Sequence, residues 1–203
     1  MGSSRRTRRS IAKAYPSGEE PRYEGGMHVI AGRFKGRALP VPPDARPAGA
    51  RLRTSLFSVL GASLEGVRVL DVCAGAGGLG FEALSRGAGH VTLIDRDPTV
   101  VRALAAWLEQ VGAAGEGRAL RLDAFAAPWP PGPFDLILLD PPFETWSDNS
   151  ALGLFDRARQ VVAPLGRLVV KLPTRQSLPE GGGWRLRERR AAGAAAFALL
   201  EAT

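Results

Sequence analysis

Residues 67–86 read VRVLDVCAGAGGLGFEALSR, and this stretch decides the fold class. Its first six residues form an apolar run typical of a buried parallel strand, and its last six have the spacing of a helix. The glycines between them follow the pattern G-x-G-x-x-G, in which Gly75 and Gly77 permit a tight turn and let a ligand approach the backbone. A strand, a glycine turn and a helix in this order predict a site for a nucleotide-type cofactor.

A second strand, residues 91–94, ends at Asp95, which lies 20 residues after Gly75. At this spacing an acidic residue can accept hydrogen bonds from ribose hydroxyls, and we include the adjacent Arg96 in the same predicted site. The fingerprint alone would also fit NAD. Asp71, at the end of the first strand, favours S-adenosylmethionine, because its carboxylate can hold a methionine ammonium but would repel a pyrophosphate.

The tetrapeptide Asp140-Pro141-Pro142-Phe143 follows another apolar run, residues 134–139, that predicts a buried strand. Proline cannot donate to a sheet ladder, so the strand must end there, at the edge where open α/β sheets bind ligands. Asp140 and the Pro141 carbonyl can accept hydrogen bonds from an amine, and Phe143 can stack on a flat ring. These four residues are our predicted catalytic loop, for methylation of a nucleobase amino group. The alternative is a structural turn with a buried Phe.

Strands and helices alternate from Gly66 onward, which predicts an α/β fold built on a doubly wound, Rossmann-like parallel sheet. Further helices are expected at residues 98–111 and 152–162, and further strands at residues 118–122, 167–172 and 184–187. Residues 191–202 are so rich in alanine that propensity favours a helix, although a final antiparallel strand stays open.

A small N-terminal extension, a β-hairpin followed by a helix, is expected before this domain. Two strands, residues 27–32 and 37–41, flank a turn, and a helix from Leu52 ends at Gly61. We therefore expect three parts, namely a disordered basic leader (1–26), an RNA-binding hairpin and helix (27–62) and a methyltransferase domain (63–203).

The positive charge of the chain is concentrated near its N-terminus. The net charge is +7, and residues 27–60 carry six basic residues against one acidic residue, whereas residues 61–203 carry 15 basic and 16 acidic residues. A localised basic segment beside a cofactor domain suits a nucleic-acid backbone, and the alternative is a solvated surface. The predicted RNA contacts are Arg33, Lys35, Arg37, Arg46, Arg51 and Arg53.

Composition excludes several other classes. The single cysteine, Cys73, cannot form an internal disulfide or a Cys-rich zinc site, and a small buried hydrophobe is a better interpretation of it than a nucleophile. His28 and His90 are the only histidines and lie far apart, so no metal site is expected. Without a signal peptide or a long apolar run, the chain is expected to be a soluble cytoplasmic protein. We also expect it to be a monomer.

Several segments together resemble a known family. They resemble the RsmD family of bacterial 16S rRNA guanine-N2 methyltransferases. The segments that carry the resemblance are residues 27–37, 46–47, 51–53, 56–57, 71–77, 82–88, 140–143 and 188–190. The resemblance implies a seven-stranded methyltransferase sheet, S-adenosylmethionine as the donor, and a guanine of 16S rRNA, free or in an assembling 30S subunit, as the acceptor. The chain departs from the family pattern at residues 48–50, at Phe143 and at residues 191–194, which bears on the RNA target more than on the chemistry.

The expected mechanism is direct methyl transfer to a guanine that flips out of its stack, with much of the rate coming from positioning. The predicted cofactor-binding residues are Asp71, Ala74, Gly75, Gly77, Asp95, Arg96, Asp123 and Ala124. Three alternatives remain. They are a DNA adenine or cytosine amino-methyltransferase, a small-molecule or protein N-methyltransferase, and a non-enzymatic Rossmann-like binding module.

Overall fold

The computed structural model describes residues 26–40, 50–179 and 181–203. The elements in chain order are α2 (Ala50–Leu60), β1 (Arg68–Val72), α3 (Gly80–Ser85), β2 (His90–Asp95), α4 (Pro98–Gln110), β3 (Gly117–Arg121), β4 (Phe134–Leu139), α5 (Glu144–Ser147), a 3-10 turn (Ser150–Leu152), α6 (Gly153–Val161), β5 (Val162–Pro173), β6 (Trp184–Ala192) and β7 (Ala195–Ala202). The predicted leader apart from Gly26, and the segment that carries Arg46, lie outside the described residues.

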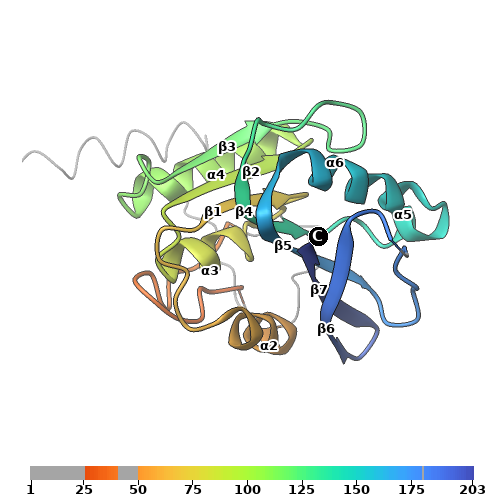
Figure 1. Cartoon of the computed structure of the whole chain (residues 1–203). Coiled ribbons are helices and arrows are strands. Elements are labelled where there is room, and N and C mark those ends of the chain that lie inside the picture. The colour runs from red at the N-terminus through yellow and green to blue at the C-terminus, as the bar shows by residue number, and fades with distance from the viewer. Residues whose placement is uncertain (1–25, 41–49, 180) are drawn as a thin grey trace, which may run out of the picture.

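The strands of the described residues form one seven-stranded sheet in the order β3-β2-β1-β4-β5-β7-β6 (Figure 1). Strands β1 to β5 pair parallel with one another, and β7 pairs antiparallel with both β5 and β6. The strand order reverses at β1, which has β2 on one side and β4 on the other. The predicted α/β fold and seven-stranded methyltransferase sheet are therefore confirmed, and the reversal marks the edge at which such sheets bind ligands.

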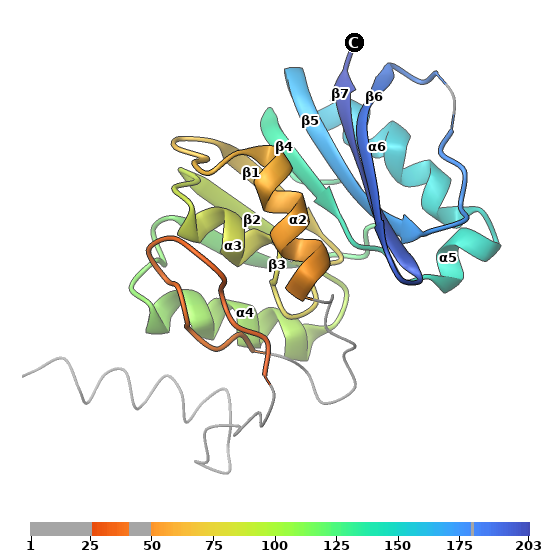
Figure 2. The ribbon, with the colours of Figure 1, turned by 90° about the horizontal axis from the view of Figure 1, so that it is seen from below.

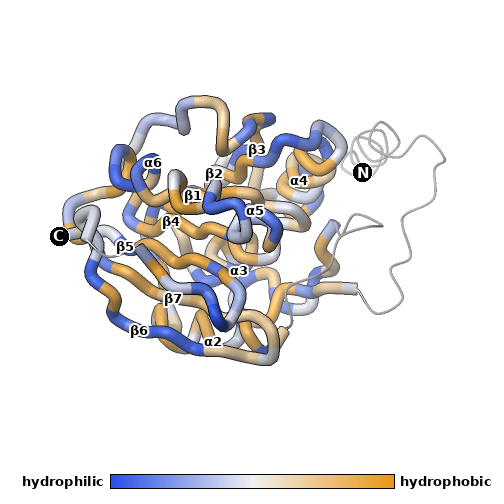
Figure 3. Tube along the Cα trace, turned by 90° about the vertical axis from the view of Figure 1, so that its right-hand side faces the viewer, coloured by the Kyte–Doolittle hydropathy of each residue, from blue (hydrophilic) through white to orange (hydrophobic). Residues whose placement is uncertain are grey.

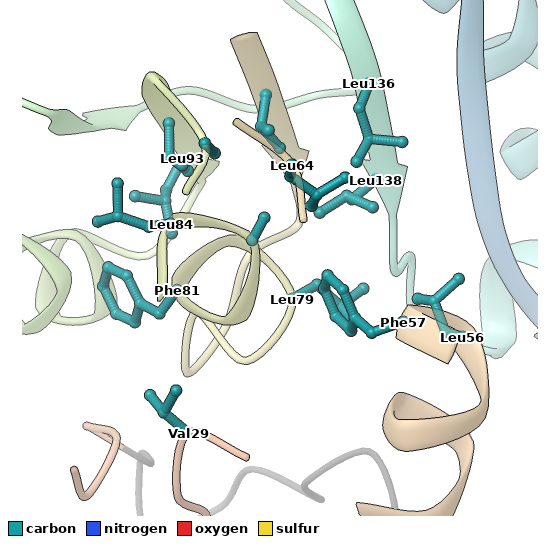
Figure 4. Packing of buried hydrophobic residues seen from close by; sticks show 14 of the residues in the cluster. Val29, Leu56, Phe57, Leu64, Leu79, Phe81, Leu84, Leu93, Leu136 and Leu138 are labelled. Atoms are coloured by element: carbon teal, nitrogen blue, oxygen red, sulfur yellow. The ribbon is translucent and has the colours of Figure 1, made fainter. Parts of the chain in front are cut away.

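Helices cover both faces of the sheet (Figure 2). Helices α2, α3 and α4 pack on one face with strand residues such as Leu93 and Leu138, and α5 and α6 pack on the other with residues such as Ile94. The apolar strands therefore run through the middle of the molecule (Figure 3). Side chains of α2 and α3, Phe57 and Phe81 among them, fill the first core (Figure 4). Each fully buried side chain of this size contributes about 2–3 kcal/mol of transfer free energy.

The N-terminal segment forms less strand than predicted. Within residues 26–40 one antiparallel bridge, His28 with Ala38, and three backbone hydrogen bonds join the two arms of a short hairpin, so the predicted hairpin is present but its two regular strands are not. The segment instead packs beside α3 and α4 (red in Figure 2), where the N–H groups of Ile30 and Ala31 donate to the buried Glu82 carboxylate at 2.7 and 3.1 Å. The Glu82 carboxylate therefore accepts hydrogen bonds from backbone N–H groups that would otherwise pair with a neighbouring strand.

One glycine permits this close packing. Gly32 has φ +83°, and a Cβ at this position would lie 1.9 Å from the carbonyl oxygen of Ser85. That distance leaves no room for any side chain, so the segment can approach α3 only with glycine there. The boundary proposed at residue 62, between this segment and the following domain, stays a prediction.

The C-terminal segment is a β-hairpin, so the helix favoured for residues 191–202 is wrong and the alternative strand is correct. Strand β6 extends to Ala192, and β7 runs back between β5 and β6. Residues 196–200 are all buried, which the two-sided core of an inner strand requires. Helix propensity is a weak local preference, and pairing with two strands overrides it.

Candidate functional site

The turn between β1 and α3 is held open by glycines and tied to the end of β2. Gly75 has φ +51°, and a Cβ there would have nothing within 4 Å, so space lies beside its backbone. Its N–H donates to Asp95 at 2.9 Å, and the other oxygen of Asp95 accepts the N–H of Asp97 at 3.0 Å. Each carboxylate oxygen has a second lone pair, so Asp95 can still accept hydrogen bonds from hydroxyl groups.

Asp71 lies below this turn at the end of β1 and is only 1% exposed. One of its oxygens accepts the N–H of Gly80 at 2.8 Å, and the other is buried without a hydrogen-bond partner. Burial raises the pKa of Asp71 well above its ordinary value, the Gly80 hydrogen bond opposes this, and the nearby Asp140 adds to the increase. A buried acceptor without a donor is costly, so this oxygen fits an ammonium group of a bound ligand.

The predicted catalytic loop leaves the sheet next to Asp71. Strands β1 and β4 are neighbours, with Asp71 opposite Leu138 and Val72 opposite Leu139. The N–H of Asp140 donates to the carbonyl of Val72 at 3.2 Å. The loop and the glycine turn therefore start from adjacent strands at the point where the strand order reverses, where ligands of such sheets bind.

The sequence analysis missed a lysine in this site. The ammonium of Lys171, on β5, lies 2.7 and 2.9 Å from the two oxygens of Asp140 and 5.8 Å from the centre of the Phe143 ring. Leu139 is opposite Val170 in the sheet, so Lys171 comes next to Asp140 at the same edge. Burial raises the pKa of Asp140, and the charge of Lys171 opposes this. The available signal was a charged residue within the otherwise apolar run of residues 168–172.

The other residues of the predicted loop differ in exposure. Pro141 is buried, Pro142 is exposed, and Phe143 is half-buried against the core under α5 and α6. The partly exposed ring can therefore offer surface to a flat ligand while the core holds it in place. Trp146, in the short helix α5 that follows, is buried in the same core.

Asp123 and Ala124 follow β3 at the same edge of the sheet. One Asp123 oxygen accepts the N–H of Phe125 at 2.9 Å, and the carbonyl of buried Ala124 accepts the indole N–H of Trp129 at 3.0 Å. The N–H of Leu122 donates to the carbonyl of Asp95 at 2.9 Å, which places this loop beside the end of β2. Arg96, next to Asp95, is exposed. The residues predicted to contact the ribose and the adenine therefore lie together.

The predicted RNA-binding residues do not share one environment. Lys35, Arg37 and Arg51 are exposed. Arg33 is also exposed, but its guanidinium pairs with Glu116, and this lowers the pKa of that carboxyl group.

Arg53 is corrected. It is 3% exposed, and its Nη2 donates to the carbonyl of His28 at 2.7 Å, so it cannot reach an RNA backbone. It lies four residues before buried Phe57 on the inner face of α2, a spacing that could have indicated burial.

Cys73 has φ +59°, and three carboxyl groups lie near enough to act on its thiol through their charge. Burial first, and then Asp95, Asp140 and Asp71, raise the pKa of Cys73 to about 12, so the thiol stays protonated at neutral pH and is a poor nucleophile. In the described part of the chain, no group of three or more His, Cys, Asp or Glu side chains could hold a metal ion. None of the helices in that part is long and apolar enough to cross a membrane.

Comparisons with known proteins agree with this geometry. The family described as Conserved hypothetical protein 95 matches residues 27–201. Ribosomal RNA small subunit methyltransferase D of Haemophilus influenzae is 31% identical over 189 residues, which cover 90% of this chain and 97% of that protein. The Escherichia coli K12 protein of the same name is 32% identical over 181 residues, covering 87% of this chain and 90% of that protein.

A solved structure gives the same result for the fold. The Escherichia coli candidate methyltransferase yhhF superimposes with a TM-score of 0.73 at 31% identity, covering 88% of this chain and 98% of that one. The sequence match spans both the glycine turn and the catalytic loop. The chain therefore belongs to the Conserved hypothetical protein 95 family, which is the RsmD family of methyltransferases.

Proposed function

We propose that this protein transfers a methyl group from S-adenosylmethionine to the exocyclic N2 amine of a guanine in 16S rRNA. One observation carries the proposal. Asp71 and Asp140 stand at the ends of adjacent strands at the reversal of the sheet, which puts a donor half-site and an acceptor half-site side by side. The relatives named as small-subunit ribosomal RNA methyltransferases support rRNA as the acceptor.

The donor half-site suits the three parts of S-adenosylmethionine. The unpartnered Asp71 oxygen fits the ammonium, Asp95 fits the ribose hydroxyls, and the loop of Asp123 and Ala124 fits the adenine. The open space beside Gly75 and the backbone of Ala74–Gly77 leave room for the methionine part. When bound, the cofactor supplies a methyl group on a positively charged sulfur, and the protein has to align that group with the acceptor.

The acceptor half-site orients an amine. Asp140 and the Pro141 carbonyl accept hydrogen bonds from the two N–H groups, so that the nitrogen lone pair points at the methyl carbon. Phe143 stacks on the flipped base and Lys171 holds the Asp140 carboxylate in place. The nitrogen–carbon bond forms as the carbon–sulfur bond breaks, and the surplus proton of the amine leaves toward Asp140 and solvent. Positioning of this kind supplies a large part of the rate.

The RNA contacts proposed after the correction are Lys35, Arg37 and Arg51, with Arg33 available if Glu116 releases it. Their exposed charges suit phosphate groups, and Arg46 belongs to the same proposed set although it lies outside the described residues. An rRNA substrate, free or in an assembling 30S subunit, would place the protein in the cytoplasm, and we propose that it acts as a monomer.

The test is methyl transfer from labelled S-adenosylmethionine to four acceptors: naked 16S rRNA, 30S particles, duplex DNA and a protein mixture. We expect label in 16S rRNA or 30S particles, and N2-methylguanosine after digestion to nucleosides. The Asp140→Asn variant serves as the inactive control. Label in DNA or protein, or on another atom of the rRNA, would contradict the proposed substrate, and no binding of S-adenosylmethionine would contradict the proposed reaction class.

A further inference from the structure

Two buried residues of opposite charge share an unusual feature. Four buried side-chain atoms of the described chain have no hydrogen-bond partner, and three of them belong to Arg53 and Asp71. They are Nε and Nη1 of Arg53 and one oxygen of Asp71. Buried polar groups in folded proteins are nearly always satisfied, so unmet groups of this kind require an explanation.

Among the residues that the structure describes, no carboxylate pairs with Arg53. Its Nη2 donates to the His28 carbonyl, and its nearest acidic neighbour, Glu82, already accepts from Ile30, Ala31 and Arg86. Burial lowers the pKa of Arg53 and Glu82 opposes this, but an arginine in a protein keeps its charge. A charge that is 3% exposed and has two free donors is costly to bury, so an anion that reaches it would gain strong, charge-assisted hydrogen bonds.

Both unmet groups lie against the same glycine turn. A Cβ at Gly78 would lie 2.9 Å from Nη1 of Arg53, and a Cβ at Gly80 would lie 2.8 Å from Oδ2 of Asp71, the oxygen that accepts the Gly80 N–H. The free donor of Arg53 and the carboxyl group that carries the free Oδ1 of Asp71 therefore border positions two residues apart, in the turn and at the start of α3. Both side chains also lie on the sheet face that α2 and α3 cover, because Arg53 belongs to α2 and Asp71 bonds to the first residue of α3.

A small cavity of about 10 Å³ adjoins Arg53. Its wall consists of apolar side chains from α2, the glycine turn, β5 and β7, together with Arg53 and Lys171. Lys171 on this wall donates to both oxygens of Asp140, whereas Nε and Nη1 of Arg53 are buried without an acceptor. A volume of this size holds about one water molecule, which is the purely structural explanation of the unmet groups.

We propose that Arg53 binds the carboxylate of the methionine part of S-adenosylmethionine, while Asp71 binds its ammonium. The methionine part of S-adenosylmethionine carries one carboxylate and one ammonium group. Arg53 and Asp71 have the opposite charges to these two groups, and both side chains lie beside the glycine turn. This inference rests on the proposed donor, and it adds a carboxylate subsite formed by α2. It also explains why an arginine is buried among the apolar residues of that helix.

The test is isothermal titration calorimetry of the full chain with S-adenosylmethionine and with decarboxylated S-adenosylmethionine. These ligands differ only in the carboxylate. We expect the wild-type protein to bind the first about 10- to 100-fold more tightly, as for hydrogen bonds to a charged group. The Arg53→Met variant should bind both ligands equally, at about the wild-type affinity for the decarboxylated one. Arg102→Met, an exposed change on α4, should keep the wild-type ratio.

Two results would overturn the inference, namely equal binding of both ligands by the wild-type protein, or an unchanged ratio in Arg53→Met. The wild-type comparison needs no variant, so it decides the question even if Arg53→Met fails to fold. In that event Arg53→Lys, which keeps the charge, should retain part of the discrimination. Equal binding of both ligands would leave the proposed rRNA methylation intact, whereas binding of neither would contradict the proposed function itself.

Discussion

The ammonium of Lys171 bridges both oxygens of the Asp140 carboxylate, at 2.7 and 2.9 Å, across neighbouring strands of the sheet. The two side chains are 17% and 25% exposed, so the pair is only partly shielded from water. Because each oxygen keeps a second lone pair, Asp140 can accept an amine hydrogen bond without releasing Lys171. The ion pair therefore fixes the direction of the carboxylate before the acceptor arrives.

The Asp140→Ala variant should lose methyl transfer by roughly 10²-fold or more, as for a catalytic hydrogen-bonding group. Its affinity for S-adenosylmethionine should stay close to that of the wild type, because Asp140 faces the acceptor. Turnover and calorimetric binding measure the two effects separately. Asp156→Ala, at an exposed position of α6, is the matched control and should behave as the wild type. Wild-type turnover in Asp140→Ala would remove this residue from the mechanism.

Replacement of Lys171 by Met should shift the pH dependence of kcat/KM. Lys171 lowers the pKa of Asp140 against the effect of burial, so without it that pKa rises. Activity requires the ionised carboxylate and is lost as pH falls through this pKa, so the acidic limb of the profile should move to higher pH in Lys171→Met. Lys171→Arg keeps a charge and should restore most of the wild-type profile. An acidic limb that does not move would show that Lys171 has no effect on Asp140.

Two glycines of the N-terminal segment provide a matched pair. Gly32 and Gly36 have φ of +83° and +81°, but a Cβ at Gly36 would meet nothing within 4 Å, whereas at Gly32 it would collide with the Ser85 backbone. Gly36→Ala should cost about 1 kcal/mol of unfolding free energy from backbone strain alone. Gly32→Ala should cost several times more and release the segment from α3. Chemical denaturation measures both, and equal losses would mean that the packing of this segment adds little stability.

Removal of two exposed cations, Lys35 and Arg51, should weaken rRNA binding and flatten its dependence on salt. Each lost phosphate contact reduces the slope of log K against log salt by about one unit, so the double alanine variant should lose up to about two. Its affinity for S-adenosylmethionine should not change. Arg102→Ala, on the exposed side of α4, is the control and should keep the full slope. An unaltered slope in the double variant would mean that these cations are only solvated.

The sequence predicted best where local pattern and burial agree. The strand that ends at Asp71 and the strand that ends at Asp140 are apolar on both faces, so their ends and their ligand-binding edge could be placed without a structure. The helix prediction for the alanine-rich residues 191–202 was wrong because helix propensity is high there. Pairing of Phe197 and its neighbours with β5 makes this segment a strand.

The errors in the site came from contacts between residues far apart in the chain. Arg53 was grouped with exposed arginines because charge alone does not distinguish a buried guanidinium from a solvated one. Lys171 was missed because its role depends on the register of β5 against β4. The part of the site that follows each strand could therefore be predicted, whereas partners brought together by sheet register and helix packing could not.

The buried polar atoms of Asp71 and Arg53 that lack hydrogen-bond partners also affect how long the protein survives in a cell. Each lowers the stability of the empty fold, and a ligand that satisfies them adds RT ln(1 + [L]/Kd) to the free energy of unfolding. A shortage of the methyl donor would then leave more molecules transiently unfolded and open to proteolysis. The abundance of this protein in a cell would in this way follow the supply of the donor.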